Sequence, residues 1–169
     1  PRSYINTNII GTLNILEGCR ENKSLTRLIH ISTSEVYGSA QTVPISESHP
    51  LVAQSPYSAS KISADKLVES YYLSFNLPVV IAWPFNTYGP RQTARAVIPT
   101  IASQLIKGNK EIRIGSLSPT RDFNYVTDTA KGMIEIALAK NVEGEVINIG
   151  SGEEFSIGKT LEIIKKILN

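Results

Sequence analysis

Residues 77–83 read Leu-Pro-Val-Val-Ile-Ala-Trp, an apolar run that leads directly into the polar segment 84–91, Pro-Phe-Asn-Thr-Tyr-Gly-Pro-Arg. Residues 27–33, Arg-Leu-Ile-His-Ile-Ser-Thr, form a second apolar run that also ends in polar side chains. Such runs are typical of parallel strands that are covered on both faces. The two segments therefore predict two strands of a parallel sheet, each followed by a polar loop at its carboxyl end.

Helical patterns alternate with these strands. Apolar residues recur every three or four positions from Ser3 to about Asn22, and a second helix begins at Ser55-Pro56 and extends to about Asn76. After Arg91 we expect helix, strand, helix, strand and helix at 96–107, 111–114, 127–139, 145–149 and 157–168. This alternation predicts an α/β fold with a parallel sheet, and the change of pattern after Arg91 indicates a smaller second lobe.

Composition narrows the class of protein. The 169 residues include 17 Lys and Arg against 15 Asp and Glu, a net charge of +2, which is too balanced for a nucleic-acid-binding surface. No apolar run approaches the roughly 20 residues of a membrane span. The single cysteine, Cys19, cannot form an internal disulfide or a thiolate metal site, which fits a cytoplasmic protein without a metal. The chain opens at Pro1 rather than Met, so we expect a fragment of a longer protein.

Tyr57 and Lys61 lie four residues apart at the start of the second helix, so their side chains share one face. A neighbouring ammonium and the helix N-terminus both favour a phenolate, which could take a hydroxyl proton during hydride transfer. Taken alone, the spacing also fits an ordinary amphipathic helix with a stray tyrosine and lysine.

Thr33, Ser34 and Glu35 follow the strand at 27–33, at the sheet edge where open α/β sheets bind their ligands. A hydroxyl there can bind a substrate oxygen, and a carboxylate can act as acid or base. The simpler interpretation is a solvated loop with local caps. Together with the tyrosine helix, the triplet makes a candidate site.

Four segments carry a resemblance to a known family: His-Ile-Ser-Thr-Ser-Glu-Val-Tyr-Gly at 30–38, Pro-Tyr-Ser-Ala-Ser-Lys at 56–61, Pro-Phe-Asn-Thr-Tyr-Gly-Pro-Arg at 84–91 and Arg-Asp-Phe-Asn-Tyr-Val at 121–126. In this order they resemble the extended short-chain dehydrogenase/reductase family of nucleotide-sugar epimerases and dehydratases. Segments 88–98 and 115–121 are most similar to bacterial UDP-N-acetylglucosamine 4,6-dehydratases of the legionaminic acid pathway, which are themselves like dTDP-glucose 4,6-dehydratases.

The resemblance implies an NAD-dependent 4,6-dehydratase, which converts a nucleotide-diphosphate hexose to its 4-keto-6-deoxy form for cell-surface polysaccharide biosynthesis. Tyr57 would take the proton of the C4 hydroxyl, Lys61 would assist it and bind the nicotinamide ribose, and Thr33 would bind the substrate. Glu35 would remove the C5 proton. Ser34 stands where many dTDP-glucose dehydratases carry an aspartic acid, whereas GDP-mannose dehydratases and UDP-glucuronate decarboxylases share Thr-Ser-Glu.

The same resemblance implies further contacts at the strand ends and beyond. Pro84 and the Tyr57–Lys61 pair would contact the cofactor. The residues expected to bind the nucleotide sugar are Asn86, Arg91, Arg121 and Asn148. Trp83 replaces an arginine common in relatives, and we assign it to packing. His30 is expected on a buried strand and His49 in a mobile loop, neither of them catalytic.

The family's glycine-rich turn for the dinucleotide has no counterpart in this sequence. We therefore expect the C-terminal part of a doubly wound, Rossmann-like parallel sheet plus a smaller α/β lobe, and no activity from this fragment alone. Residues 1–90 would form the second half of the dinucleotide-binding domain with the catalytic residues. Residues 91–169 would form mostly the sugar-nucleotide-binding lobe, with the chain crossing back between the lobes.

The resemblance also implies a homodimer that pairs through the helix at 3–22 and the helix that carries Tyr57. Three alternatives remain open for the function. Two are related enzymes, a nucleotide-sugar 4-epimerase and a UDP-glucuronate decarboxylase. The third is a catalytically inactive module that binds a nucleotide sugar.

Overall fold

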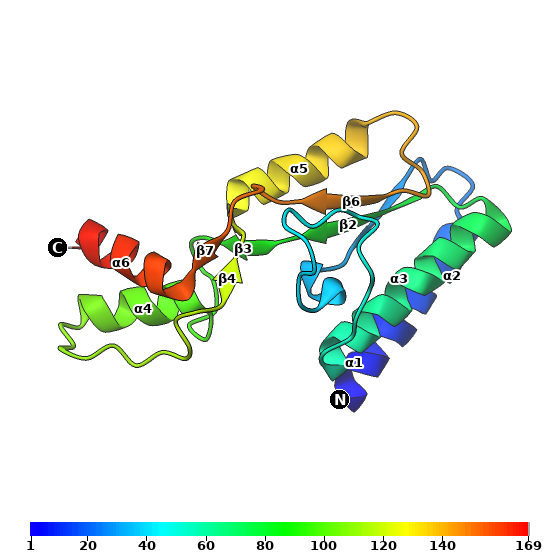
Figure 1. Cartoon of the computed structure of the whole chain (residues 1–169). Helices are drawn as coiled ribbons and strands as arrows, with labels where there is room; N and C mark the ends of the chain where they lie inside the picture. Colours follow the sequence, from blue (N-terminus) through cyan, green and yellow to red (C-terminus); the bar gives the residue numbers. More distant parts are fainter. Residues whose placement is uncertain (169) are drawn as a thin grey trace. The chain divides into compact units, whose positions relative to one another are not determined.

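The structure is a computed structural model that describes residues 1–168 (Figure 1). The chain divides into two compact units. The first unit comprises residues 1–85 and 129–149, and the second comprises residues 86–128 and the chain from Gly150 on. Among the described residues, none of the helices combines the length and the apolarity that crossing a lipid bilayer requires.

The first unit is built on a parallel sheet in the order β1 (Leu28–Ile31), β2 (Val79–Pro84) and β6 (Val146–Ile149). Leu28 lies opposite Val79, and Ile81 lies opposite Val146. The parallel sheet expected from the two apolar runs is therefore confirmed, and β2 is its central strand.

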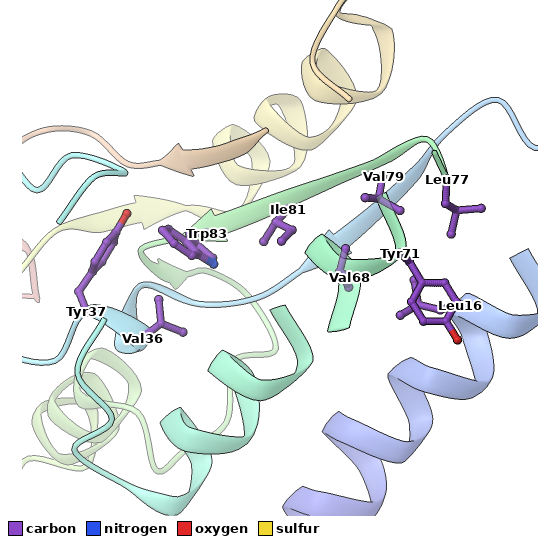
Figure 2. Packing of buried hydrophobic residues seen from close by; sticks show 9 residues of the cluster. All are labelled: Leu16, Val36, Tyr37, Val68, Tyr71, Leu77, Val79, Ile81 and Trp83. Carbon is purple, nitrogen blue, oxygen red and sulfur yellow. The ribbon is translucent and has the colours of Figure 1, made fainter. Parts of the chain in front are cut away.

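The core explains why the sequence of β2 is apolar at nearly every position. Val79, Ile81 and Trp83 pack on one face, whereas Val80 and Ala82 pack on the other with Ile136. Figure 2 shows the first of these clusters between β2 and the helices. Since a fully buried aliphatic side chain stabilises the fold by about 1.5–3 kcal/mol, these alternating residues fix the strand in place.

Helices cover both faces of this sheet. The N-terminal helical stretch comprises α1 (Arg2–Tyr4), the π-helix η1 (Ile5–Ile10) and α2 (Gly11–Glu21), followed after β1 by the short 3-10 helix η2 (Ser34–Tyr37). α3 (Pro56–Phe75) packs against α2, η1 and β2, and the part of α5 (Val126–Leu138) from Thr129 on covers the opposite face.

The ends of α3 agree with the sequence pattern. Ser55 caps the helix because its side chain accepts a hydrogen bond from the backbone N–H of Ser58 at 3.0 Å, and Pro56 occupies the first helical position. Asn76 ends the helix in a left-handed conformation with φ of 54°. The N-cap fixes the first turn of α3, where Tyr57 and Lys61 lie.

The second unit contains two small pairs of strands and two helices. β3 (Asn86–Tyr88) pairs in parallel with β5 (Phe123–Tyr125), and β4 (Thr120–Arg121) pairs antiparallel with β7 (Phe155–Ser156). α4 (Val97–Ile106) and α6 (Ile157–Leu168) pack against each other (Figure 1). The expected helices at 96–107 and 157–168 are thus confirmed.

The strand expected at 111–114 is wrong. The side chain of Gln104 instead binds both backbone groups of Arg113: its Oε1 accepts the N–H at 2.8 Å, and its Nε2 donates to the carbonyl at 3.0 Å. An extended run without a neighbouring strand can satisfy its backbone through a side chain, and periodicity does not register the difference.

Candidate active site

The candidate residues of the first unit gather at the carboxyl end of the parallel sheet. β1 ends at Ile31, and Thr33, Ser34 and Glu35 follow it, the last two within η2. Thr33 caps η2 by accepting a hydrogen bond from the Glu35 N–H at 3.2 Å. Pro84 ends the neighbouring strand β2. This is the edge at which open α/β sheets bind ligands.

A hydrogen bond joins η2 to the first turn of α3. Ser58 is 2% exposed, and its hydroxyl donates to the backbone carbonyl of Glu35 at 2.8 Å. Because Ser58 immediately follows Tyr57, this bond brings the triplet and the tyrosine together. The structure therefore joins two candidate segments that are more than 20 residues apart in the sequence.

Tyr57 and Lys61 lie on one face of α3, as their spacing predicts. Lys61 is 9% exposed, and its Nζ donates to the backbone carbonyl of Ile31, the last residue of β1, at 2.8 Å. A hydrogen bond with the Thr33 side chain stabilises the Tyr57 phenolate. The pair is thus attached to the strand end at two points.

The electrostatics of Tyr57 differ from the sequence-based expectation. Burial raises the pKa of Tyr57, the negative charge of Glu35 raises it further, and the Thr33 hydrogen bond only partly opposes them. Burial lowers the pKa of Lys61, and the negative charge of Asp65 opposes that shift. The expected lowering of the Tyr57 pKa is therefore wrong for the chain by itself. Desolvation is the largest cause of the raised pKa of Tyr57.

Sequence reasoning missed two residues of the N-terminal helical stretch that contact this pair's helix. The ring of Tyr4 packs edge-on against Tyr57, with 5.7 Å between ring centroids. The side-chain amide of Asn8 donates to the hydroxyl of Ser60 at 2.9 Å. Tyr4 and Asn8 are four residues apart on one helical face, a spacing that could have marked them.

A buried acid beneath the pair was also missed. Asp65 is 2% exposed, and its Oδ2 accepts hydrogen bonds from the Ser32 hydroxyl at 2.8 Å and the Trp83 indole at 2.9 Å. Its Oδ1 lies 3.1 Å from Nε2 of His30 on β1. The assignment of Trp83 to packing holds, since it is 3% exposed, but the indole has this polar contact as well.

Asn148 on β6 binds both Tyr37 of η2 and the segment 39–55. Its Oδ1 accepts a hydrogen bond from the Tyr37 hydroxyl at 2.8 Å, and its Nδ2 donates to the carbonyl of Ile45 at 3.1 Å. Its backbone N–H donates to the carboxylate of Glu47 at 2.9 Å. Burial of the Tyr37 phenol raises its pKa. These contacts fasten the long loop to the third strand of the sheet.

His49 in this loop is not in a mobile environment, contrary to the expectation. It is 7% exposed, its Nε2 accepts the backbone N–H of Gln41 at 3.0 Å, and its Nδ1 lies 2.8 Å from the carbonyl of Pro50. Since a carbonyl only accepts, Nδ1 carries the proton. A tyrosine ring, that of Tyr37, packs edge-on against the imidazole at 5.3 Å. The histidine fixes the loop.

The second unit brings Asn86 and Arg121 into neighbouring positions. The backbone N–H of Asn86 donates to the carbonyl of Asp122, the residue after Arg121, at 3.0 Å. Arg121 is exposed, and its guanidinium donates to the carbonyl of Thr120 at 2.6 Å. Arg91 is exposed in a left-handed turn with φ of 67°. Asn86 and Arg121 thus form a local pair, and Arg91 is placed separately.

The carboxylate of Asp122 organises the turn at 150–152. It accepts hydrogen bonds from the backbone N–H groups of Ser151 at 3.1 Å and Gly152 at 2.9 Å, and from the Ser151 hydroxyl at 2.7 Å. Within residues 1–168 no group of three or more His, Cys, Asp or Glu side chains could hold a metal ion.

The chain resembles known proteins in both sequence and structure. The chain is 37% identical over 177 residues to a dTDP-D-glucose 4,6-dehydratase of Dictyostelium discoideum, covering 98% of the chain and 40% of the relative. Among solved structures, it resembles the UDP-glucuronic acid 4-epimerase of Bacillus cereus, in complex with UDP-glucuronic acid and NAD. The TM-score is 0.90 at 36% identity, covering 96% of this chain and 52% of that one.

A second solved structure, the dTDP-glucose 4,6-dehydratase of Bacillus anthracis in complex with NAD, has a TM-score of 0.89 at 37% identity. The match covers 96% of this chain and 52% of that one. The chain thus spans about half the length of the proteins that it matches. These likenesses confirm the α/β fold class and agree with the expectation of NAD.

The narrower resemblance to UDP-N-acetylglucosamine dehydratases is not shown by these comparisons, which include both dehydratases and epimerases. A family model identifies the broader family of the chain. Residues 1–168 match the family model described as GDP-mannose 4,6 dehydratase, and the chain belongs to that family of extended short-chain dehydrogenases/reductases.

Proposed function

We propose that the protein carrying this chain is an NAD-dependent nucleotide-sugar 4,6-dehydratase acting on a UDP-N-acetylhexosamine. The observation that carries the proposal is the position of Glu35, an exposed carboxylate close enough to Tyr57 to raise its pKa. Elimination requires a base for the C5 proton close to the base that takes the C4 hydroxyl proton, and Glu35 beside Tyr57 fits that requirement. The choice of sugar rests on segments 88–98 and 115–121.

The residues at the strand end fit the nicotinamide ribose of NAD. Lys61 has three donor hydrogens, and the carbonyl of Ile31 takes one of them. The other two are available for ribose hydroxyls in a largely buried position. Pro84 at the end of β2 would contact the same part of the cofactor. Bound NAD would supply a hydride acceptor and a cationic ring.

Tyr57 is the proposed base for the C4 hydroxyl. In the chain alone it is a neutral phenol, because burial and Glu35 raise its pKa. Positive charge near the phenol has to offset those two effects before it can take a proton. Lys61 and the Thr33 hydrogen bond act in that direction, and Thr33 also offers its hydroxyl to the substrate.

Glu35 and Ser34 divide the elimination between them. Glu35 would remove the C5 proton, which becomes acidic once C4 is a ketone. Ser34, partly buried at the start of η2, has no ionisable group and would donate a hydrogen bond to the leaving C6 hydroxyl. The proton that this leaving group needs would come from a water molecule and pass through the Ser34 hydroxyl.

The second unit would bind the nucleotide diphosphate. The guanidinium of Arg121 is exposed, its donors exceed the single bond to Thr120, and a planar fork suits a phosphate. Asn86 lies beside it through Asp122, and Arg91 would add a second positive charge. For Asn148, the proposal is a contact with the sugar nucleotide through the amide hydrogen that its bond to Ile45 leaves over.

A homodimer is the proposed assembly, through the N-terminal helical stretch and α3. Ile5, Ile10 and Ile15 are 46–58% exposed along the first of these elements, and Leu73 and Phe75 are 50–74% exposed at the end of the second. Exposed apolar side chains on adjacent helices favour an interface between subunits. Sedimentation equilibrium of the protein and of an Ile15→Glu variant tests this assembly.

A 4-epimerase is the second candidate, favoured by the similarity to the UDP-glucuronic acid 4-epimerase. An epimerase needs Tyr57 and Lys61 but no base at C5. Glu35 therefore separates the two activities.

The experiment uses the protein expressed from its complete reading frame, with UDP-N-acetylglucosamine as substrate. Glu35→Gln should leave oxidation at C4 but block the loss of water, because the amide cannot take the C5 proton. Tyr57→Phe, the matched control, should block oxidation itself. Rapid-quench mass spectrometry follows the 4-keto sugar and its dehydrated form. Full dehydration by the Glu35→Gln variant contradicts the assignment of Glu35.

A further inference from the structure

We propose that Asp65 is a positioning residue whose buried negative charge keeps Lys61 protonated and in register with Tyr57. This inference rests on the proposed function for its catalytic meaning, but its physical content concerns the chain itself. Within the described chain, Asp65 has no hydrogen bond to the strand-end triplet. Its charge raises the pKa of Lys61, and it also raises the pKa of Tyr57. The proposed role concerns the first of these effects.

The first argument is the geometry of α3. Tyr57, Lys61 and Asp65 follow one another at intervals of four residues and therefore form one line along a single helical face. Lys61 is 9% exposed and Asp65 is 2% exposed, so little water separates the two charges. An ammonium and a carboxylate one turn apart attract each other more strongly in such a place than at the surface.

The second argument is the way in which the carboxylate is held. Ser32 at the end of β1 and Trp83 on β2 both donate to Oδ2, at 2.8 and 2.9 Å. The imidazole of His30 lies 3.1 Å from Oδ1 without the alignment of a hydrogen bond. Donors from two strands thus prevent the side chain from turning away, and Asp65 holds α3 to the sheet.

The third argument concerns charge at Lys61. Burial favours the neutral amine, and the Asp65 charge opposes it. Of the other titratable groups, Glu35 from η2 and Tyr4 from α1 face Tyr57, whereas His30 from β1 lies against Asp65. Glu35 is exposed and lies on the Tyr57 side, so Asp65 is the buried counter-charge of the ammonium.

A purely structural role makes a different prediction. The hydroxyl of Ser32 and the indole of Trp83 require only an oxygen acceptor, which an asparagine in place of Asp65 supplies in the same shape. A role through charge is lost in that variant, although both hydrogen bonds stay. Asp65→Asn therefore separates the two explanations.

The test is a titration of Lys61 in the protein expressed from its complete reading frame, followed by NMR of ¹³C-labelled lysine. The Lys61 signal is assigned by its absence from a Lys61→Gln variant. Removing the negative charge one helical turn away should lower the Lys61 pKa in Asp65→Asn by about one unit. The alkaline limb of the pH–rate profile should move down by the same amount.

Two further variants complete the test. Trp83→Phe removes a hydrogen bond from the same carboxylate but keeps its charge, so the Lys61 pKa should stay at the parent value while stability falls. Asp65→Glu also keeps the charge and should retain the parent pKa, which answers the question if Asp65→Asn does not fold. An unchanged Lys61 pKa in Asp65→Asn, or a fall in Asp65→Glu or Trp83→Phe, overturns the proposal.

The titration does not depend on the reaction. A protein that lacks dehydratase activity but shows the shift refutes the proposed function and leaves the role of Asp65 intact. An active dehydratase in which Asp65→Asn leaves the Lys61 pKa unchanged refutes the role of Asp65 and leaves the proposed function intact.

Discussion

Arg27 stabilises the amino-terminal edge of the sheet, opposite to the edge that carries the candidate site. It immediately precedes β1, and its side chain is 12% exposed. One guanidinium nitrogen donates to the carbonyls of Ile136 at 2.8 Å, Ala137 at 3.0 Å and Ala139 at 2.6 Å, and the other binds the carboxylate of Glu143. A cation at the carboxyl end of α5 also interacts favourably with the helix dipole.

The magnitude follows from these contacts. A guanidinium nitrogen carries two hydrogens, so the three carbonyls share two bonds, and the exposed carbonyl of Ala137 can bind water instead. A hydrogen bond from a charged group contributes about 1.5–3 kcal/mol, so the one or two bonds that water does not replace give about 1.5–6 kcal/mol. We expect Arg27→Met to lower the free energy of unfolding by this amount. The amount does not include the lost contact with Glu143.

Urea unfolding of the protein and of Arg27→Met measures the difference. Lys66→Met is the matched control, because Lys66 pairs with Glu69 at the surface and such exposed pairs contribute less than about 1 kcal/mol. At temperatures where it is folded, Arg27→Met should keep the parent's turnover, since Arg27 lies away from the site. A loss below about 1 kcal/mol, or one equal to that of Lys66→Met, refutes the role assigned to Arg27.

Two other predictions concern stability. Gly144→Ala should cost more than about 2 kcal/mol in urea unfolding, because φ is +86° and the added Cβ would lie 2.2 Å from the Tyr72 ring. Gly152→Ala, at a φ of +76° with open space around it, should cost only about 1 kcal/mol; equal losses contradict the steric argument. The Arg27 hydrogen bond lowers the pKa of Glu143, so this carboxylate stabilises the fold above its unfolded pKa of 4.5 and loses that effect as the pH falls through the folded value. The stability difference between the protein and Glu143→Gln should therefore shrink as the solution is acidified below pH 4.5, and a constant difference contradicts the assignment.

The strands and helices of the first unit could be predicted because their residues obey simple periodicities. Val79–Pro84 is apolar at each position since both faces of β2 are covered, and Ser55-Pro56 marks the start of α3 through a cap and a fixed φ. Such signals are local and survive in a single sequence.

The short strands of the second unit could not be predicted in the same way. β4 (Thr120–Arg121) and β7 (Phe155–Ser156) have two residues each, too few to show a period, and they exist only because they pair with one another. The failed strand at 111–114 shows the opposite case, an extended pattern that the side chain of Gln104 satisfies.

The candidate site also contains some residues that the sequence could predict and others that it could not. The i, i+4 spacing of Tyr57 and Lys61 indicated their shared face, whereas the buried charge of Asp65 depends on donors from two strands, Ser32 and Trp83. The direction of the Tyr57 pKa shift also needed the structure, because it depends on burial.

The most direct test of the proposed function is the product formed from UDP-N-acetylglucosamine in deuterated water by the protein expressed from its complete reading frame. If Glu35 removes the C5 proton of a 4-keto intermediate, NMR and mass spectrometry should show a 4-keto-6-deoxy sugar with deuterium at C5. Inversion at C4 with the C6 hydroxyl retained contradicts the account and favours an epimerase. Carbon dioxide released from UDP-glucuronate, with no dehydration of UDP-N-acetylglucosamine, contradicts it in favour of a decarboxylase.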